Sequence, residues 1–157
     1  MQQIPCLVDG SLSVWESHSI VRYLASGYSP DLHLDSIEGM AQCSPWMDWA
    51  LFIDFHECNC LILDQTARTK PEDRDMGNIL RGYEGYLERF QKVEQRLGDT
   101  GGFLAGERFS IADIPVGVEV CRFSCCLERC ALDGLLSGWK LPSLPNLAAT
   151  RLPLLGD

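Results

Sequence analysis

Residues 4–17 combine, in a very short space, the pattern of a strand, a turn, a second strand and a helix start. The run 6–8 is β-prone, Asp9-Gly10 is a dipeptide that favours a type I′ turn, and residues 12–14 alternate with period two. We therefore predict a two-stranded antiparallel hairpin. Apolar residues at helical spacing follow it directly, which predicts a helix from about Ser17 to Leu24.

Glu16 and Ser17 stand where the second predicted strand gives way to this helix. Unpaired backbone N–H groups and the positive end of the helix dipole meet at such a point. An anion is therefore expected to bind at Ser17, whose hydroxyl and N–H are donors, while the Glu16 carboxylate is suited to an ammonium group. The alternative is that Ser17 only caps the helix and Pro5 only begins an edge strand.

The remainder of the chain is predicted to be helical. Residues 25–31 include several turn-forming residues and a proline, which predicts a domain boundary near residue 27. A long apolar segment, 40–66, follows with Asp35 or Ser36 as its cap, and an amphipathic helix is expected over 79–97, ending before Gly98.

Aromatic residues in the segment 40–66 repeat at three to four residues, which predicts a helix that is buried on two faces. Trp46 and Trp49 lie on one of these faces and Phe52 lies on the other. Each of the three is a candidate for a pocket wall, although a plain core position is the alternative for any single aromatic residue here.

Ser110 and Asp113 have the spacing of a capping box, in which each side chain bonds the backbone of the other. Phe109 and Ile114 are placed to form a hydrophobic staple across the same turn. We expect this cap to begin a helix with few charges that belongs to the core. Its role is structural, so its loss is predicted to lower stability without altering ligand chemistry.

Composition excludes several classes of protein. The net charge of −9 and the lack of a basic run argue against nucleic-acid binding. No apolar stretch is long enough to span a membrane and no basic segment precedes one, which predicts a soluble, cytoplasmic chain without a membrane partner.

Eight cysteines are present, of which Cys121, Cys125, Cys126 and Cys130 share helical spacing. Zinc sites normally use separated pairs of ligands on turns. We therefore expect no metal and interpret these cysteines as small buried apolar residues.

Two phrases resemble cytosolic glutathione transferases of the theta-like or bacterial-like type. The first is Ile4-Pro5-x-Leu-Val-Asp-Gly10 with Trp15-Glu-Ser-x-x-Ile-x-x-Tyr-Leu24, and the second is Phe103-Leu104-Ala105-Gly106 followed by the cap at Ser110. The resemblance implies an α+β, mostly α fold. Residues 1–27 would be part of a thioredoxin-like domain, and residues 28–157 would be the all-α domain.

The same resemblance implies a glutathione site. The backbone of Ile4, joined to Pro5 by a cis peptide bond, would pair with the cysteinyl part of glutathione, and Glu16 and Ser17 would hold the γ-glutamyl end. Trp46, Trp49 and Phe52 would face a small electrophile, and a homodimer is expected. The alternative is a non-catalytic assembly module, as in the translation elongation factor gamma subunit.

No thiol-activating residue can be assigned from the sequence. In the family, the Tyr, Ser or Cys that favours the glutathione thiolate comes from a strand-helix-strand unit before the position of Ile4. The three residues before Ile4 supply neither a hydroxyl nor a thiol. We therefore expect the sequence to represent a longer protein.

Overall fold

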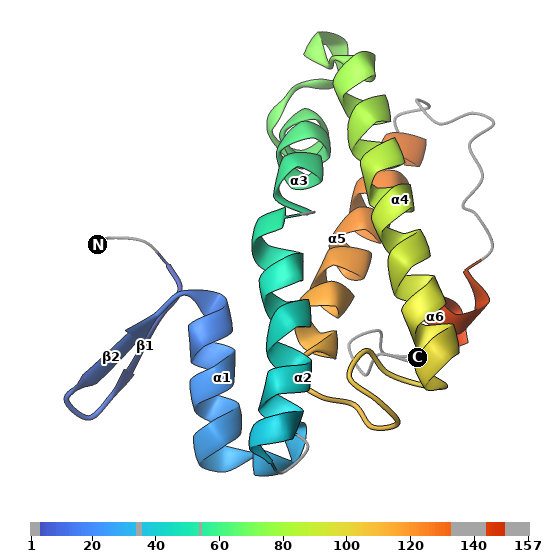
Figure 1. The fold of residues 1–157 in the computed structure, drawn as a ribbon. Helices are drawn as coiled ribbons and strands as arrows, with labels where there is room; N and C mark the ends of the chain where they lie inside the picture. The colour runs from blue at the N-terminus through green and yellow to red at the C-terminus, as the bar shows by residue number, and fades with distance from the viewer. Residues whose placement is uncertain (1–3, 34–35, 54, 133–143, 150–157) are drawn as a thin grey trace.

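The computed structural model describes residues 4–33, 36–53, 55–132 and 144–149 (Figure 1). The strands and α-helices are β1 Cys6–Asp9, β2 Leu12–Trp15, α1 Ser17–Tyr28, α2 Ile37–Asp48, α3 Phe55–Leu63, α4 Met76–Thr100, α5 Asp113–Leu132 and α6 Pro145–Ala149. Shorter elements are 3-10 helices Pro30–His33 and Pro71–Asp73 and π-helices Trp49–Ile53 and Asp64–Arg68. The predicted α+β, mostly α class is confirmed.

The predicted hairpin is present, but its turn lies one residue later than expected. Strands β1 and β2 pair antiparallel, and Asp9 is the partner of Leu12. Gly10 and Ser11 are therefore the central residues, and Gly10 has a φ of 59° that suits glycine. The hairpin projects to one side of the helices (Figure 1).

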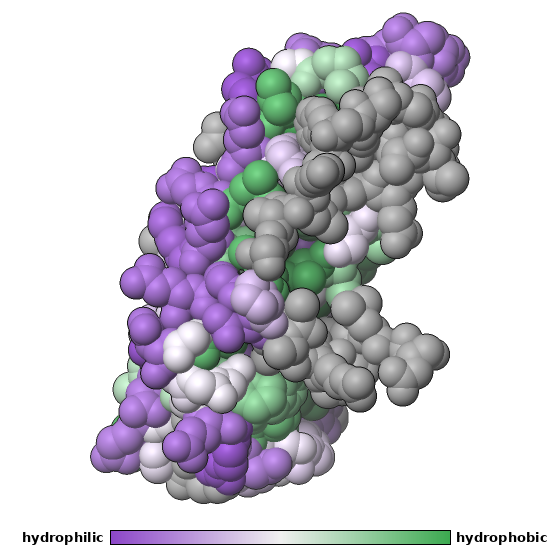
Figure 2. Space-filling view, turned by 90° about the vertical axis from the view of Figure 1, so that its right-hand side faces the viewer, coloured by the Kyte–Doolittle hydropathy of each residue, from purple (hydrophilic) through white to green (hydrophobic). Residues whose placement is uncertain are grey.

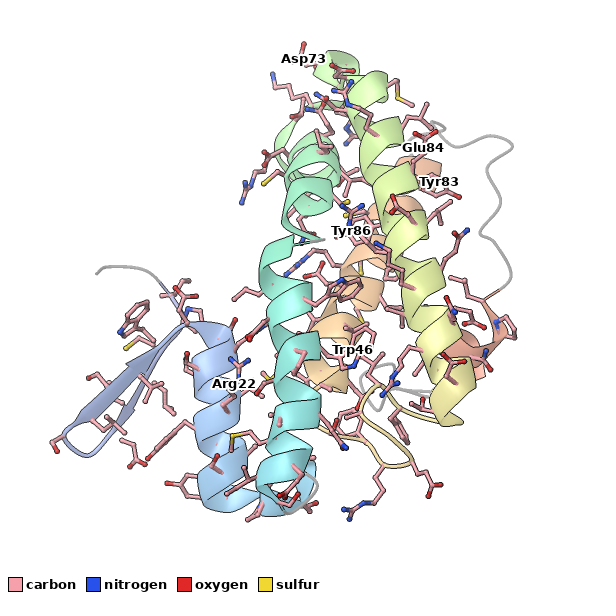
Figure 3. The ribbon with its side chains drawn as sticks, in the orientation of Figure 1. Arg22, Trp46, Asp73, Tyr83, Glu84 and Tyr86 are labelled. Carbon is pink, nitrogen blue, oxygen red and sulfur yellow. The ribbon has the colours of Figure 1, made fainter. Side chains whose placement is uncertain are left out.

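Helix α1 ties the hairpin to the helical core. On one side, the Asp9 carboxylate accepts hydrogen bonds from the hydroxyls of Tyr23 at 2.6 Å and Tyr28 at 2.9 Å. On the other side, Arg22 lies between α1 and α2 and pairs with Asp48 at 2.5 Å (Figure 3). The helix continues four residues beyond the predicted end, because Ala25 is buried in the core.

The predicted single helix over 40–66 is divided. Ser36 caps its start and accepts a hydrogen bond from the Gly39 N–H at 2.9 Å, as expected. The α-helical pattern then widens into π-helix twice, over Trp49–Ile53 and Asp64–Arg68. Apolar periodicity cannot reveal these π-turns, because each changes the face of the helix by a single inserted residue.

Helix α4 extends past its predicted end at Gly98. Asp75 caps its start, and Gly101, with a φ of 74°, ends it. Gly98 instead allows α6 to approach, because a Cβ there would lie 3.3 Å from Asn146 Nδ2. The Glu94 carboxylate accepts the Asn146 N–H at 2.8 Å, which secures the start of α6.

The core lies between α2, α3, α4 and α5, and its centre is aromatic. The Phe123 ring lies 4.8 Å from that of Tyr86, 5.3 Å from Phe90 and 5.7 Å from Tyr83, measured between centroids. On the outer side, hydrophilic atoms form a band down the face of the molecule that bears α4 and α6 (Figure 2). The predicted amphipathic character of α4 is therefore present.

The cap at the start of α5 is built as a closed set of hydrogen bonds. Asp113 accepts from the Ser110 N–H at 2.9 Å, the Ser110 hydroxyl at 3.0 Å and the Leu104 N–H at 2.8 Å. Ser110 Oγ in turn accepts from the Ala112 N–H at 3.3 Å. Asp113 thus joins the loop at Leu104 to the first turn of α5.

No helix within the described ranges is long and apolar enough to cross a membrane.

Candidate functional site

The junction of β2 and α1 has an unusual backbone. Glu16, the residue before the helix, has a φ of 67° and a ψ of 124°, a conformation that is costly for any residue except glycine. Its side chain makes no capping hydrogen bond to the described residues. Glu16 therefore does not cap the first-turn N–H groups of α1, which include that of Ser17. An anion site at a helix start requires such uncapped N–H groups.

We expect Glu16→Gly to raise the free energy of unfolding by about 1 kcal/mol, because the strained φ is natural for glycine and the gain exceeds the added chain entropy. Urea denaturation followed by circular dichroism measures the change. Ser19→Gly is the matched control, because Ser19 is exposed in the first turn of the same helix, and it should destabilise. A loss of stability in Glu16→Gly would contradict the prediction.

A cavity of about 490 Å³ opens beside this junction. Pro5, Ser17, His18 and Val21 form the wall on the hairpin and α1 side. The peptide bond between Ile4 and Pro5 is cis, as the resemblance implies. Of the four residues expected to hold glutathione, Pro5 and Ser17 line the cavity. Ile4 and Glu16 are exposed and do not line it.

The opposite wall comes from the π-helix Trp49–Ile53, α3 and α5. Its apolar part consists of Ala50, Leu51, Ile114, Pro115 and Val118, and its polar part consists of Asn59, Glu119 and Arg122. The cavity therefore lies between segments that are about a hundred residues apart in the sequence, and both segments are needed to form it.

His18 lies in this cavity with an unsatisfied ring nitrogen. The residue is 9% exposed, and its Nδ1 has no hydrogen-bond partner among the described residues. Burial lowers the pKa of His18, and the positive charge of Arg22 lowers it further, against the opposing influence of Asp48 and Glu119. The imidazole is therefore neutral at pH 7.

Glu119 is the centre of a buried polar network. Its Oε2 accepts from the Tyr86 hydroxyl at 3.0 Å and from Asn59 Nδ2 at 2.9 Å, and its Oε1 pairs with Arg122. The Tyr86 hydroxyl also contacts Asn59 Oδ1. Burial, together with the charge of Glu119, raises the pKa of Tyr86, so the phenol remains a donor.

The structure does not bring the predicted tryptophans into the cavity. The rings of Trp46 and Trp49 pack edge to face at 5.6 Å, and Arg96 lies 6.0 Å from the Trp46 centroid. Figure 3 shows Trp46 between α2 and α4. Ala50 and Leu51, in the π-helix that begins at Trp49, line the cavity instead. The Phe52 side chain lies outside the described part of the structure.

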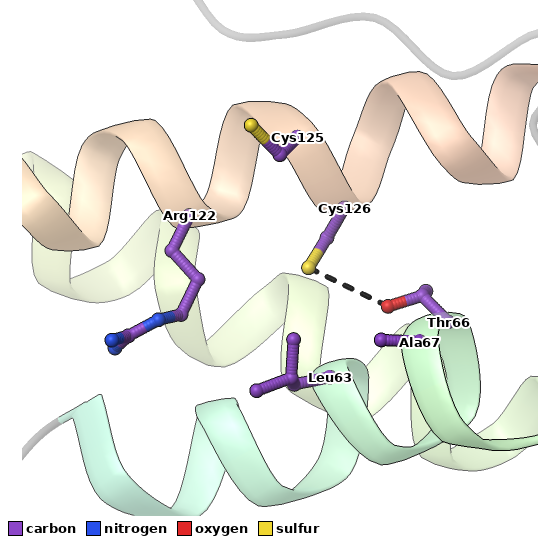
Figure 4. A pocket seen from close by; sticks show the side chains of 6 residues that line it. All are labelled: Leu63, Thr66, Ala67, Arg122, Cys125 and Cys126. Carbon is purple, nitrogen blue, oxygen red and sulfur yellow. Dashed lines mark hydrogen bonds between the residues drawn. The ribbon is translucent and has the colours of Figure 1, made fainter.

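A second hollow of about 390 Å³ adjoins α5 and is lined by Leu63, Thr66, Ala67, Arg122, Cys125 and Cys126 (Figure 4). The buried Cys126 thiol contacts Thr66 Oγ1 at 3.5 Å, whereas Cys125 is exposed. The expectation of uniformly buried cysteines is therefore wrong for Cys125, because only one side of α5 faces the core at this turn. The Cys130 side chain lies outside the described residues.

Within the described ranges, no group of three or more His, Cys, Asp or Glu side chains is placed to hold a metal ion.

Sequence reasoning missed Asn59, Glu119 and Arg122 as cavity residues. One signal was available. Between residues 114 and 126, Glu119 and Arg122 are the only charged residues, and they are three apart on an otherwise apolar helix. A charged pair at that spacing in a core helix indicates a buried polar site.

No protein-family model matches the chain. Glutathione S-transferase GstB of Escherichia coli K12 is 34% identical over 118 residues, which cover 72% of this chain and 55% of GstB. Glutathione S-transferase F10 of Arabidopsis thaliana is 28% identical over 127 residues, covering 71% of this chain and 54% of F10. The chain therefore spans about half the length of these curated relatives.

Solved structures that resemble the chain are also named as glutathione S-transferases. The theta class glutathione S-transferase of Xanthomonas axonopodis pv. citri, in its apo form, has a TM-score of 0.80 and 29% identity, covering 97% of this chain and 73% of that chain. The crystal structure of the theta class enzyme from the same organism with glutathione bound has a TM-score of 0.79, and the match covers 96% of this chain and 66% of that chain.

Proposed function

Since this chain belongs to the glutathione S-transferase family, we propose that its cavity binds glutathione and that the whole protein conjugates the glutathione thiolate to small electrophiles. One observation carries the proposal. Pro5 and Ser17, which the family resemblance assigns to glutathione, line one wall of a cavity of about 490 Å³ whose other wall comes from the π-helix Trp49–Ile53, α3 and α5. That volume is within the range of small-molecule sites.

The γ-glutamyl and cysteinyl parts of glutathione each have a counterpart in this arrangement. The Ser17 hydroxyl and the N–H groups at the start of α1 receive the γ-glutamyl carboxylate, and the exposed Glu16 carboxylate receives the α-ammonium group. The backbone beside Pro5 pairs with the cysteinyl part. The apolar wall, with Leu51 and Val118, takes the body of the electrophile. Glutathione is the co-substrate and no metal takes part.

None of the described cavity residues is assigned to activation of the glutathione thiol. Ser17 is the one hydroxyl among the described side chains that line the cavity, and it is already assigned to the carboxylate. The neutral imidazole of His18 is buried against the core, and we assign it no role in thiol activation.

Glutathione is expected to stabilise the folded chain. A ligand that binds only the folded state adds about 1.4 kcal/mol at ten times its Kd, which corresponds to a rise of a few degrees in Tm. A thermal melt with and without millimolar glutathione measures this rise. Ser17→Ala should remove most of it, because the carboxylate loses a hydrogen-bond donor.

Ser19→Ala is the matched control, since Ser19 is an exposed serine on the same first turn and does not line the cavity. It should keep the full shift. The dipeptide Cys-Gly, which lacks the γ-glutamyl end, should give little shift with any variant. A cooperative melt that does not respond to glutathione would contradict the proposed function.

The wider proposals follow the family. We place residues 1–27 in the thioredoxin-like part and residues 28–157 in the helical domain, and we propose a cytoplasmic homodimer. Light scattering that shows only monomer at micromolar concentration would contradict the dimer. The alternative of an assembly module is not supported by the relatives described above, each of which is named as a glutathione S-transferase.

A further inference from the structure

The polar part of the cavity wall lies opposite the residues proposed to hold glutathione. Asn59 comes from α3, and Glu119 and Arg122 come from α5, while Ser17 and His18 lie on the α1 side. A wall that served only apolar ligands would gain nothing from three polar side chains, because burying polar groups is costly unless they are bonded.

The acceptors of this wall are already occupied. Glu119 is buried, and both of its oxygens accept hydrogen bonds, from Tyr86 and Asn59 on one side and from Arg122 on the other. A ligand therefore meets no vacant carboxylate here. The negative charge of Glu119 is balanced by the guanidinium of Arg122.

Donors remain available. Arg122 uses Nη1 for Glu119, and a guanidinium carries five N–H groups. Its side chain is 36% exposed, compared with 10% for Glu119, and it lines the cavity. Asn59 uses Nδ2 for Glu119, and that amide group carries a second N–H. The wall thus presents donors that are held in place by a buried carboxylate.

Resting on the proposed function, we propose that Arg122, supported by Asn59, binds a carboxylate group of the second substrate. The electrophile would be an amphiphilic acid. Its apolar body would lie against Leu51 and Val118, and its carboxylate would face the guanidinium. Glu119 is a positioning residue, because it fixes Arg122 without presenting a vacant oxygen to the ligand.

The proposal is tested with two glutathione conjugates that differ by one carboxylate, S-benzylglutathione and S-(4-carboxybenzyl)glutathione. Isothermal titration calorimetry of the full chain at pH 7.5 gives the Kd of each. We expect the carboxylated conjugate to bind about tenfold more tightly, as for a charge-assisted hydrogen bond. This comparison needs no variant, so it stands even if substitutions impair folding.

Arg122→Met should abolish the preference and leave the Kd of S-benzylglutathione within about twofold. Because that variant leaves the buried Glu119 charge unpaired, the double variant Glu119→Gln/Arg122→Met is prepared beside it. Arg81→Met is the matched control, since Arg81 is exposed on α4 and does not line the cavity. It should keep the tenfold preference.

The outcomes separate this inference from the proposed function. If S-benzylglutathione binds but the added carboxylate brings no gain, the carboxylate site is wrong and the glutathione site stands. If Arg122→Met weakens both conjugates equally, Arg122 acts on glutathione itself, and the inference is again overturned. If neither conjugate binds to the folded chain, the proposed function fails and the inference fails with it.

Discussion

Phe123→Ala is expected to lower the free energy of unfolding by about 4 kcal/mol. The Phe123 side chain is 3% exposed, and its ring contacts three other aromatic rings at centroid distances of 4.8 to 5.7 Å. The substitution removes the apolar burial and the ring contacts together, and it leaves a cavity between α4 and α5 that the neighbouring rings cannot fill. Urea denaturation, followed by circular dichroism at 222 nm, measures the change.

Two variants bracket this effect. Phe123→Leu keeps most of the volume and should cost about 1.5 kcal/mol, because only the ring contacts are lost. Leu80→Ala, on α4, removes an apolar side chain that is 42% exposed and should cost about 0.5 kcal/mol. A loss in Phe123→Ala no larger than that of Leu80→Ala would show that the aromatic cluster does not form the core.

Asp113→Ala is expected to cost about 3 kcal/mol, because it removes the acceptor of three buried donors at once. The N–H groups of Leu104 and Ser110 and the hydroxyl of Ser110 all donate to this carboxylate. Leu104 and Ser110 are buried, so water cannot replace the lost acceptor without opening the loop. The same denaturation measurement gives the change.

Ser110→Ala is the comparison, because it loses only the hydroxyl and should cost about 1 kcal/mol. The glutathione-dependent rise in Tm should persist in both variants, since neither residue lines the cavity. A double-mutant cycle should show positive coupling between Ser110 and Asp113. Full stability in Asp113→Ala would mean that the first turn of α5 forms without its cap.

Local sequence signals predicted the parts of the fold that depend on neighbouring residues. The hairpin, the caps at Ser36 and Ser110 and the stripe of α4 all arise from residues within a few positions of one another. Such elements are specified by turn chemistry and periodicity. The family resemblance added the cis bond before Pro5 and the position of Ser17.

The cavity could not be predicted in the same way, because its walls meet only in the folded chain. Trp46 and Trp49 have the spacing of pocket residues, but the π-helix that begins at Trp49 places Ala50 and Leu51 at the cavity instead. Asn59 and Glu119 lie 60 residues apart, and their hydrogen bond follows from the packing of α3 against α5. Periodicity carries no information on such pairs.

The hairpin has little packing against the rest of the molecule, because its strands are largely exposed. Among the described side chains, Tyr23 and Tyr28 of α1 hold it by hydrogen bonds to Asp9. The wall at Pro5 is therefore attached to α1 by two phenol–carboxylate hydrogen bonds that lie outside the cavity lining. Because only a docked hairpin supplies this wall, any loss of docking would lower the apparent affinity in proportion, and Tyr23 and Tyr28 contribute to binding without lining the cavity.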